Sequence, residues 1–147
     1  MKAPMTSETY QLTDFTPYLL NIAAETASLD FQVHYKAKYG MLRTEWRVIF
    51  HLGQFGAMPA KEICSRACIH KTKVSRAVSA LEAKRFVSRD TLEDDRRHAM
   101  LSLTHKGTRV YENLFEAAQN FDLALTKDFT TEEQATLRKC LLKIARL

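Results

Sequence analysis

Two short helical segments separated by only three residues constrain the fold of this chain more than any other feature. Residues 59–67 (PAKEICSRA) open with a proline, which the first turn of a helix tolerates, so we expect Pro59 at the first helical position. The tight connection CIH follows, and a second helix is expected from about residue 71 to residue 85. Its apolar positions recur at helical spacing and are Val74, Val78 and Leu81. Two helices joined by so short a turn form a helix-turn-helix.

The hydrophobic period changes directly after the second of these helices. Residues 86–104 (FVSRDTLEDDRRHAMLSLT) have short, alternating apolar positions on either side of a charged tip. This pattern predicts a two-stranded hairpin, which after a helix-turn-helix is a wing.

A longer helical pattern precedes these elements, over residues 15–38. At 1.5 Å per residue it predicts one amphipathic helix about 36 Å long. Its apolar positions are Phe15, Leu19, Ile22, Leu29 and Val33. A 147-residue monomer does not easily cover so long a stripe, so we expect part of it to meet another subunit.

The remaining helices are placed by their start and stop signals. Gly40 breaks the first helix, and Thr44 is expected to cap a second helix that ends at Gly56. Thr104 is expected to cap a helix that begins near residue 106. After a break near residue 129, Thr131 followed by Gln134 predicts a capping box for the final helix.

These elements together predict a mainly α fold with a small β-hairpin wing. We expect residues 1–147 to form a single domain, with a winged helix-turn-helix over 42–104 and dimerisation helices over 12–38 and 107–147. No apolar run approaches the roughly 18 residues of a membrane span, and the first 20 residues lack the order of a signal peptide. We therefore expect a cytoplasmic protein without a membrane partner.

The net charge of +5 is concentrated in one part of the chain. Between Cys68 and Arg109 ten Lys or Arg side chains face five acidic ones, whereas the remainder of the chain is neutral. A solvated charged face is the ordinary explanation of such an excess. Here it coincides with the helix-turn-helix, which favours a polyanionic partner.

Two segments carry a resemblance to a known family. HKTKVSRAVSALEAKRFVSR is similar to the recognition helix of the multiple-antibiotic-resistance regulator (MarR) family, and DDRRHAMLSLTHKG is similar to its aspartate-arginine wing. The resemblance covers nearly the whole chain. It implies a homodimeric transcription regulator, a repressor responsive to a ligand, that binds an inverted-repeat operator in double-stranded DNA and has no enzymatic activity and no cofactor.

The resemblance and the physics of B-DNA together assign the DNA-binding residues. An α-helix fits the major groove, where its exposed polar side chains reach base edges and phosphates. We expect this role for Lys71, Thr72, Lys73, Ser75 and Arg76. Arg76 either contacts guanine or holds a phosphate, with the phosphate role slightly ahead, and Thr72 has the alternative of capping the helix.

The wing tip is the second DNA-binding element that the resemblance implies. Arg97, with Arg96 beside it, is expected to enter the minor groove, whose negative potential attracts a guanidinium. Asp95 is expected to fix the tip by accepting hydrogen bonds. An exposed ion pair is the alternative for Asp95 and Arg97. Arg85 departs from the family pattern, because it stands where a glycine usually forms a left-handed cap that an arginine adopts only at some energetic cost. We therefore expect a differently built helix end, and Arg85 has the alternative of adding a phosphate contact.

Many members of the family release DNA when a small aromatic anion enters a cleft between the dimerisation helices and the winged region. The resemblance implies such a site here, with flat apolar groups and cations as its lining. The expected lining residues are His34, Tyr39, Arg43, Trp46, Arg47, Phe50 and His51. Aromatic residues at helical spacing are more often ordinary core, and that alternative stays open.

Other functions find less support in the sequence. Cys64 and Cys68 lie four residues apart, but a small packed side chain explains Cys64 better than thiol sensing does, and the five histidines lack ligand spacing, so no metal site is expected. A hydrolase lacks any nucleophile elbow, phosphate loop or metal-binding helix. A winged-helix module that binds protein instead of DNA is the remaining alternative, which the basic recognition helix argues against.

Overall fold

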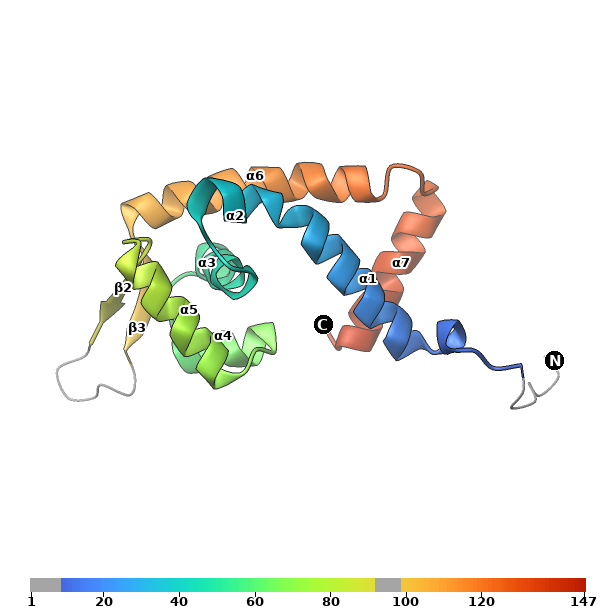
Figure 1. The fold of residues 1–147 in the computed structure, drawn as a ribbon, viewed down its shortest axis with the longest axis horizontal. Coiled ribbons are helices and arrows are strands. Elements are labelled where there is room, and N and C mark those ends of the chain that lie inside the picture. The colour runs from blue at the N-terminus through green and yellow to red at the C-terminus, as the bar shows by residue number, and fades with distance from the viewer. Residues whose placement is uncertain (1–8, 92–98) are drawn as a thin grey trace.

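The computed structural model describes residues 9–91 and 99–147, and it is mostly helical with a small antiparallel sheet (Figure 1). This confirms the expected fold class. The elements are η1 (Leu12–Asp14), α1 (Thr16–Phe31), α2 (Val33–Tyr39), α3 (Arg43–Phe55), β1 (Met58–Pro59), α4 (Ala60–Ala67), α5 (Lys71–Ala83), β2 (Val87–Asp90), β3 (Met100–Leu103), α6 (His105–Leu125) and α7 (Thr131–Ala145).

The sheet contains one strand more than the sequence predicted. β2 and β3 pair as the expected hairpin, with Val87 opposite Leu103, and β1 adds to the free side of β3, which gives the order β1-β3-β2. Pro59 lies in β1 opposite Met100 and is the N-cap residue of α4. The prediction that it occupies the first turn of that helix is therefore wrong. A two-residue strand is recognisable only through its partner, which lies about forty residues further along the chain.

A continuous core joins α3, α4, α5, the sheet and the first half of α6. Its fully buried side chains include Val48, Ile49, Ile63, Val74, Val78, Leu81, Leu101 and Leu114. The three predicted apolar positions of α5 are therefore in the core. Gly107 allows α6 to pack closely on the sheet, because a Cβ at this position would lie 1.9 Å from the carbonyl oxygen of Phe86.

Several helix ends differ from the predicted ones. The expected helix over residues 15–38 is interrupted at Gln32, which separates α1 from α2. Thr44 does not cap α3. Leu42 occupies that position, and its backbone N–H donates to the carboxylate of Glu45 at 2.9 Å. The capping box of α7 is formed one residue earlier than predicted, by Thr130 and Glu133.

Other helix ends agree with the sequence. Gly40 ends α2 in the left-handed region with φ 62°, and Gly56 ends α3. Thr104 caps α6 by accepting a hydrogen bond from the N–H of Gly107 at 2.9 Å.

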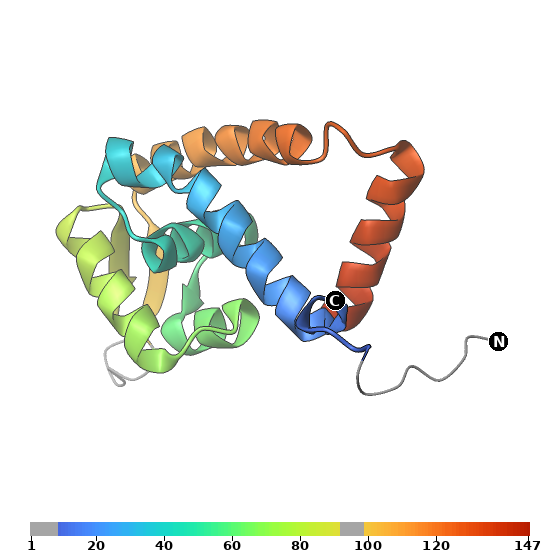
Figure 2. The same ribbon diagram turned by 45° about the vertical axis from the view of Figure 1, so that its right-hand side comes forward.

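The terminal helices reach outside the core. α6 extends beyond the winged region, and α7 turns back from its far end toward the beginning of α1 (Figures 1 and 2). Every residue from 131 to 147 is exposed. The exposed large apolar side chains of α1, of α7 and of residue 147 are Leu19, Ile22, Leu29, Leu137, Leu141, Leu142, Ile144 and Leu147. Within the described ranges, no helix combines the length and the hydropathy that crossing a bilayer requires.

Candidate nucleic-acid interface and effector cavity

The five residues predicted to bind DNA on the recognition helix all lie on α5 and are exposed. Thr72 and Arg76 are four residues apart and so share one face of the helix. Lys71 and Ser75 line a groove of about 510 Å³ on the side of α4 and β2, together with Lys61 and Arg89. Lys73 lies on the other side, toward α3. The polar side chains of α5 thus divide into one outward pair and two flanks.

The turn before α5 is closed by backbone geometry and by a histidine. Cys68 ends α4 in the left-handed region with φ 53°. His70 is the N-cap of α5, and its Nδ1 accepts a hydrogen bond from the N–H of Thr72 at 3.2 Å. The alternative that Thr72 itself caps the helix is therefore wrong, and the Thr72 side chain makes no such bond.

The other end of α5 keeps the left-handed cap although it lacks the glycine. The N–H of Phe86 donates to the carbonyl of Leu81 at 3.0 Å and the N–H of Arg85 to that of Glu82 at 2.9 Å, which together form a Schellman motif. Arg85 adopts φ 63° in it. The Thr104 hydroxyl donates to the carbonyl of Arg85 at 2.6 Å and so ties the helix end to the start of α6.

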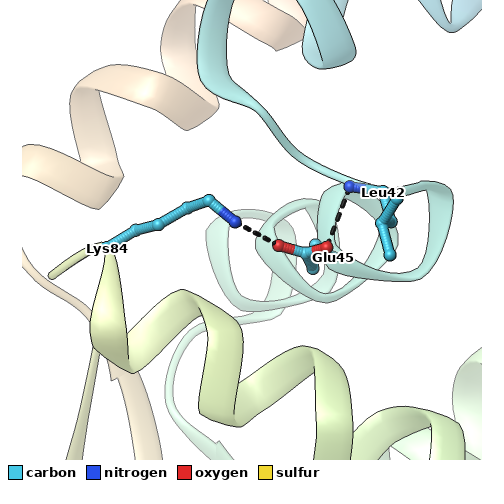
Figure 3. A network of polar contacts seen from close by, with 3 residues as sticks. All are labelled: Leu42, Glu45 and Lys84. Atoms are coloured by element: carbon cyan, nitrogen blue, oxygen red, sulfur yellow. Dashed lines mark hydrogen bonds and ion pairs between the residues drawn. The ribbon is translucent and has the colours of Figure 1, made fainter.

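A buried ion pair fixes the C-terminal end of α5 to α3 (Figure 3). The carboxylate of Glu45 is 3% exposed; one oxygen accepts from Lys84 Nζ at 2.7 Å and the other from the N–H of Leu42. Removing a charge from water is costly unless the charge is paired and hydrogen-bonded, and both conditions hold here. The sequence analysis missed this pair. Its only signal was a Glu three residues after the helix start, the position of a capping-box acid.

The predicted wing residues Asp95, Arg96 and Arg97 lie outside the described residues. The strands below the tip are held together by a hydrogen bond of 3.1 Å between the hydroxyls of Ser88 and Ser102. Arg89 of β2 also donates to Glu82 of α5 at 2.9 Å, which fixes the wing against the recognition helix.

A cavity of about 370 Å³ lies between α1, α2, α3 and α6. Three of the seven predicted lining residues, Arg43, Trp46 and Phe50, contribute to it. The aromatic side chains of Phe31, Tyr35 and Phe121, which the sequence analysis did not select, complete the apolar wall. Burial raises the pKa of Tyr35 above its ordinary value, an effect that Arg43 opposes, so its hydroxyl stays protonated at neutral pH.

Arg43 is the cation of this cavity, and it is already paired. Its Nη1 donates to Glu25 of α1 at 2.8 Å, and both side chains are about half exposed. An exposed pair of this kind contributes little free energy, so the guanidinium exchanges partners readily.

The other four predicted lining residues lie elsewhere. His34 lines a separate groove against α6, and the Tyr39 hydroxyl donates to Asn113 Oδ1 at 2.7 Å. His51 Nδ1 lies 2.7 Å from the carbonyl oxygen of Arg47. Arg47 extends away from the cavity and donates from Nη2 to the carbonyl of Ala67 at the end of α4, at 2.6 Å. Helical spacing predicted which helices carry these residues, but it did not show which residues of each helix face the cavity and which face away from it.

Among the described residues, the thiols and the metal-ligating side chains form no shared site. Cys64 is half-buried against the core, while Cys68 and Cys140 are exposed and unbridged. In residues 9–91 and 99–147, no three His, Cys, Asp or Glu side chains gather where they could hold a metal ion.

Comparisons with known proteins agree with this geometry. Residues 42–99 match the model of the MarR family. The chain is similar to the HTH-type transcriptional regulator FarR of Neisseria gonorrhoeae, at 25% identity over 103 residues that cover 70% of each chain. Among solved structures it is similar to a MarR/EmrR family transcriptional regulator from Acinetobacter sp. ADP1, with a TM-score of 0.82, 26% identity and coverage of 93% of this chain and 96% of that one.

A further solved structure shares the fold at lower identity. BpsR of Bordetella bronchiseptica has a TM-score of 0.81 and 18% identity, over 94% of this chain and 98% of BpsR, and its DNA binding is regulated by 6-hydroxynicotinic acid.

Proposed function

We propose that this chain, which belongs to the MarR family of DNA-binding transcription regulators, represses transcription as a homodimer on an inverted-repeat operator and leaves the operator when an aromatic acid binds. Members of this family are transcription regulators and not enzymes, so the alternative that the chain is a hydrolase is wrong. The observation that carries the proposal is the recognition helix α5, which buries its apolar face completely and leaves every one of its predicted DNA-binding side chains exposed.

The exposed apolar surface of α1 and α7 supports the homodimer. A single chain leaves Leu137 and Ile144 of α7 at 43% and 53% exposure, as it does Leu19 and Ile22 of α1 at 46% and 45%. Exposed apolar side chains gathered on two helices in this way mark an interface with another protein. A second copy of the chain offers the same stripe around a twofold axis, and the two stripes then cover each other.

The division of α5 into faces assigns roles to its side chains. Thr72 and Arg76 share the outward face, so we place them against the base edges, with Arg76 the residue that reads guanine. Lys71 and Lys73 on the two flanks face the phosphates that border the groove. At the wing, Arg97 enters the minor groove with Arg96 beside it as a second DNA-binding residue, and Asp95 supports the tip, as the family resemblance implies.

Binding isotherms on selected duplexes test this assignment. Selection from a random library should return inverted repeats with half-sites about 10 base pairs apart. Arg76→Ala should then lose about 1 to 3 kcal/mol on the preferred sequence and little on a scrambled one. The exposed Lys36 of α2, changed to Ala, is the matched control. An equal loss of binding free energy on both duplexes would assign Arg76 to a phosphate. If the selection returned only asymmetric sites, the proposal of a dimer on an inverted repeat would be wrong.

The aromatic cavity supports the response to a ligand. Five aromatic rings suit a flat ligand, and Arg43, which shares the lining with Asp122, offers a cation for one carboxylate; BpsR, which has the same fold, responds to 6-hydroxynicotinic acid. We propose that the carboxylate of an aromatic acid replaces Glu25 as the ion-pair partner of Arg43. That exchange shifts α3, whose Glu45 holds the end of the recognition helix through Lys84.

Trp46 is the only tryptophan of the chain and lies in this cavity, which gives a direct assay. 6-Hydroxynicotinic acid and benzoate should change its fluorescence and weaken operator binding, whereas benzamide, which lacks the charge, should do neither at the same concentration. Arg43→Met should abolish the response and Lys36→Met should retain it. Unchanged fluorescence and affinity with every acid tested would refute the effector site while leaving the DNA-binding proposal intact.

A further inference from the structure

A second cleft, separate from the aromatic cavity, lies between the start of α3 and the turn that joins α4 to α5. It has a volume of about 210 Å³. A liquid water occupies about 30 Å³, so the cleft has room for a small tetrahedral anion with its remaining waters. Its lining is Arg43, Thr44, Arg47, Cys68, Ile69, His70 and Lys73.

The charges of this cleft are of one sign. Arg43, Arg47 and Lys73 line it, and no carboxylate among the described residues does. Arg43 is balanced by Glu25 on its outer side, whereas Lys73 has no ion-pair partner in residues 9–91 and 99–147. Burial, and after it the repulsion from Arg43, lowers the pKa of Arg47 from its ordinary value. An anion in the cleft relieves this repulsion.

Donors are available to hold such an anion. Arg47 uses one N–H of its guanidinium on the carbonyl of Ala67 and has four others, and the fork they form fits two oxygens of a phosphate. His70 accepts through Nδ1, so its neutral ring carries the proton on Nε2 and donates there. The Thr44 hydroxyl adds a neutral donor from the first turn of α3.

We propose that this cleft is a phosphate-binding site in which Arg47, Thr44 and Lys73 hold one phosphate group. The group comes either from the operator backbone or from a free phosphate. The first source rests on the proposed function, since Lys73 lies on the flank of the recognition helix and the cleft opens beside it. Arg47 is thereby assigned to phosphate instead of to the aromatic effector.

Two measurements distinguish the sources. In the first, salt-dependent binding to the operator is compared between the wild type and Arg47→Gln, which keeps a side-chain N–H donor for Ala67 but removes the charge. If the backbone supplies the phosphate, the slope of log affinity against log salt should fall by about 1 for each subunit, as expected for one lost phosphate contact. Lys36→Gln, which removes one charge outside the cleft, should leave the slope unchanged.

The second measurement uses no DNA. Inorganic phosphate should slow alkylation of Cys68 by N-ethylmaleimide, relative to chloride at equal ionic strength, in the wild type and not in Arg47→Gln. Alkylation is followed for each cysteine by mass spectrometry, and the exposed Cys140 is the internal reference. If Arg47→Gln does not fold, Lys73→Gln, which changes only an exposed side chain of the cleft, replaces it in the alkylation assay.

A reduced salt slope identifies the operator backbone as the source, and protection of Cys68 with an unchanged slope identifies a free phosphate. Neither effect, in a wild type that binds its operator, overturns the site and leaves the proposed function standing. A wild type that binds no duplex refutes the proposed function, and the alkylation assay alone then decides whether the cleft binds phosphate.

Discussion

The winged region and the terminal helices have equally regular apolar stripes, but only the winged region buries its stripes within the same chain. In the winged region Ile63, Leu81 and Leu101 are at most 1% exposed. In α7 every residue is exposed, and Leu141 and Ile144 remain at 40% and 53% exposure. Helical periodicity therefore identifies a face that needs a partner, and it does not say whether the partner belongs to the same chain.

The largest change in stability is expected within the winged region, from Lys84→Met. This substitution leaves the carboxylate of Glu45 buried without its cation, which should lower the free energy of unfolding by about 3 kcal/mol. Urea denaturation measures it. Arg66→Met is the matched control, since its partner Glu62 is 43% exposed and an exposed pair contributes less than about 1 kcal/mol.

A double variant sharpens that result. Glu45→Gln with Lys84→Met removes both charges, and the loss should be smaller than in Lys84→Met alone. Equal losses in the two variants would show that the methionine disturbs packing and that the ion pair is not the cause.

The next effect concerns the terminal helices, from Leu137→Glu combined with Leu141→Glu. Four carboxylates placed in the proposed apolar interface should raise the dimer dissociation constant at least about 100-fold, which is about 2.7 kcal/mol. Light scattering measures the mass, and circular dichroism should still report a folded winged region. Lys139→Glu on the same helix is the control. A monomeric wild type, or a dimeric double variant, would remove α7 from the interface.

Gly107→Ala acts where α6 leaves the winged region. The added Cβ meets the Phe86 carbonyl, so the backbone must shift, and we expect a loss of about 2 kcal/mol in thermal or urea unfolding. Gly40→Ala meets no atom within 4 Å and should lose only the roughly 1 kcal/mol of its left-handed conformation. A larger loss at Gly40 than at Gly107 would contradict the close packing described here.

The smallest effect is expected at the end of α5. Arg85→Gly removes the strain of φ 63°, and the greater freedom of glycine in the unfolded chain offsets part of the gain, so stability should rise by less than about 1 kcal/mol. Calorimetry at fixed protein concentration resolves this change. A clear destabilisation would mean that the arginine side chain stabilises the helix end in a way that its backbone geometry does not reveal.

Local features of the fold followed from the sequence, and remote ones did not. Periodicity placed α3 to α7 and the hairpin, because each depends on side chains a few residues apart. β1 was missed because two residues form a strand only when β3 pairs with them. Thr44 and Thr131 were chosen as caps by residue type, but the backbone places Leu42 and Thr130 at those positions.

The candidate sites divide in the same way. The exposed face of α5 was predicted, because one helix carries all of it. The cavity was predicted in part, since Arg43, Trp46 and Phe50 share one face of α3 while Phe31 and Phe121 reach it from two other helices. Glu45 and Lys84 are 39 residues apart, and only the packing of α3 on α5 brings them together.

Pro59 in the two-residue strand β1 also bears on how the protein behaves at high concentration. A free sheet edge recruits strands from other chains, and a proline at the edge offers no N–H for such pairing. The opposite edge, β2, has the exposed charges of Arg89 and Asp90 along it. Both borders of the sheet are therefore poor templates for aggregation, so two wings brought close together on adjacent operators can remain separate proteins instead of joining into a larger sheet.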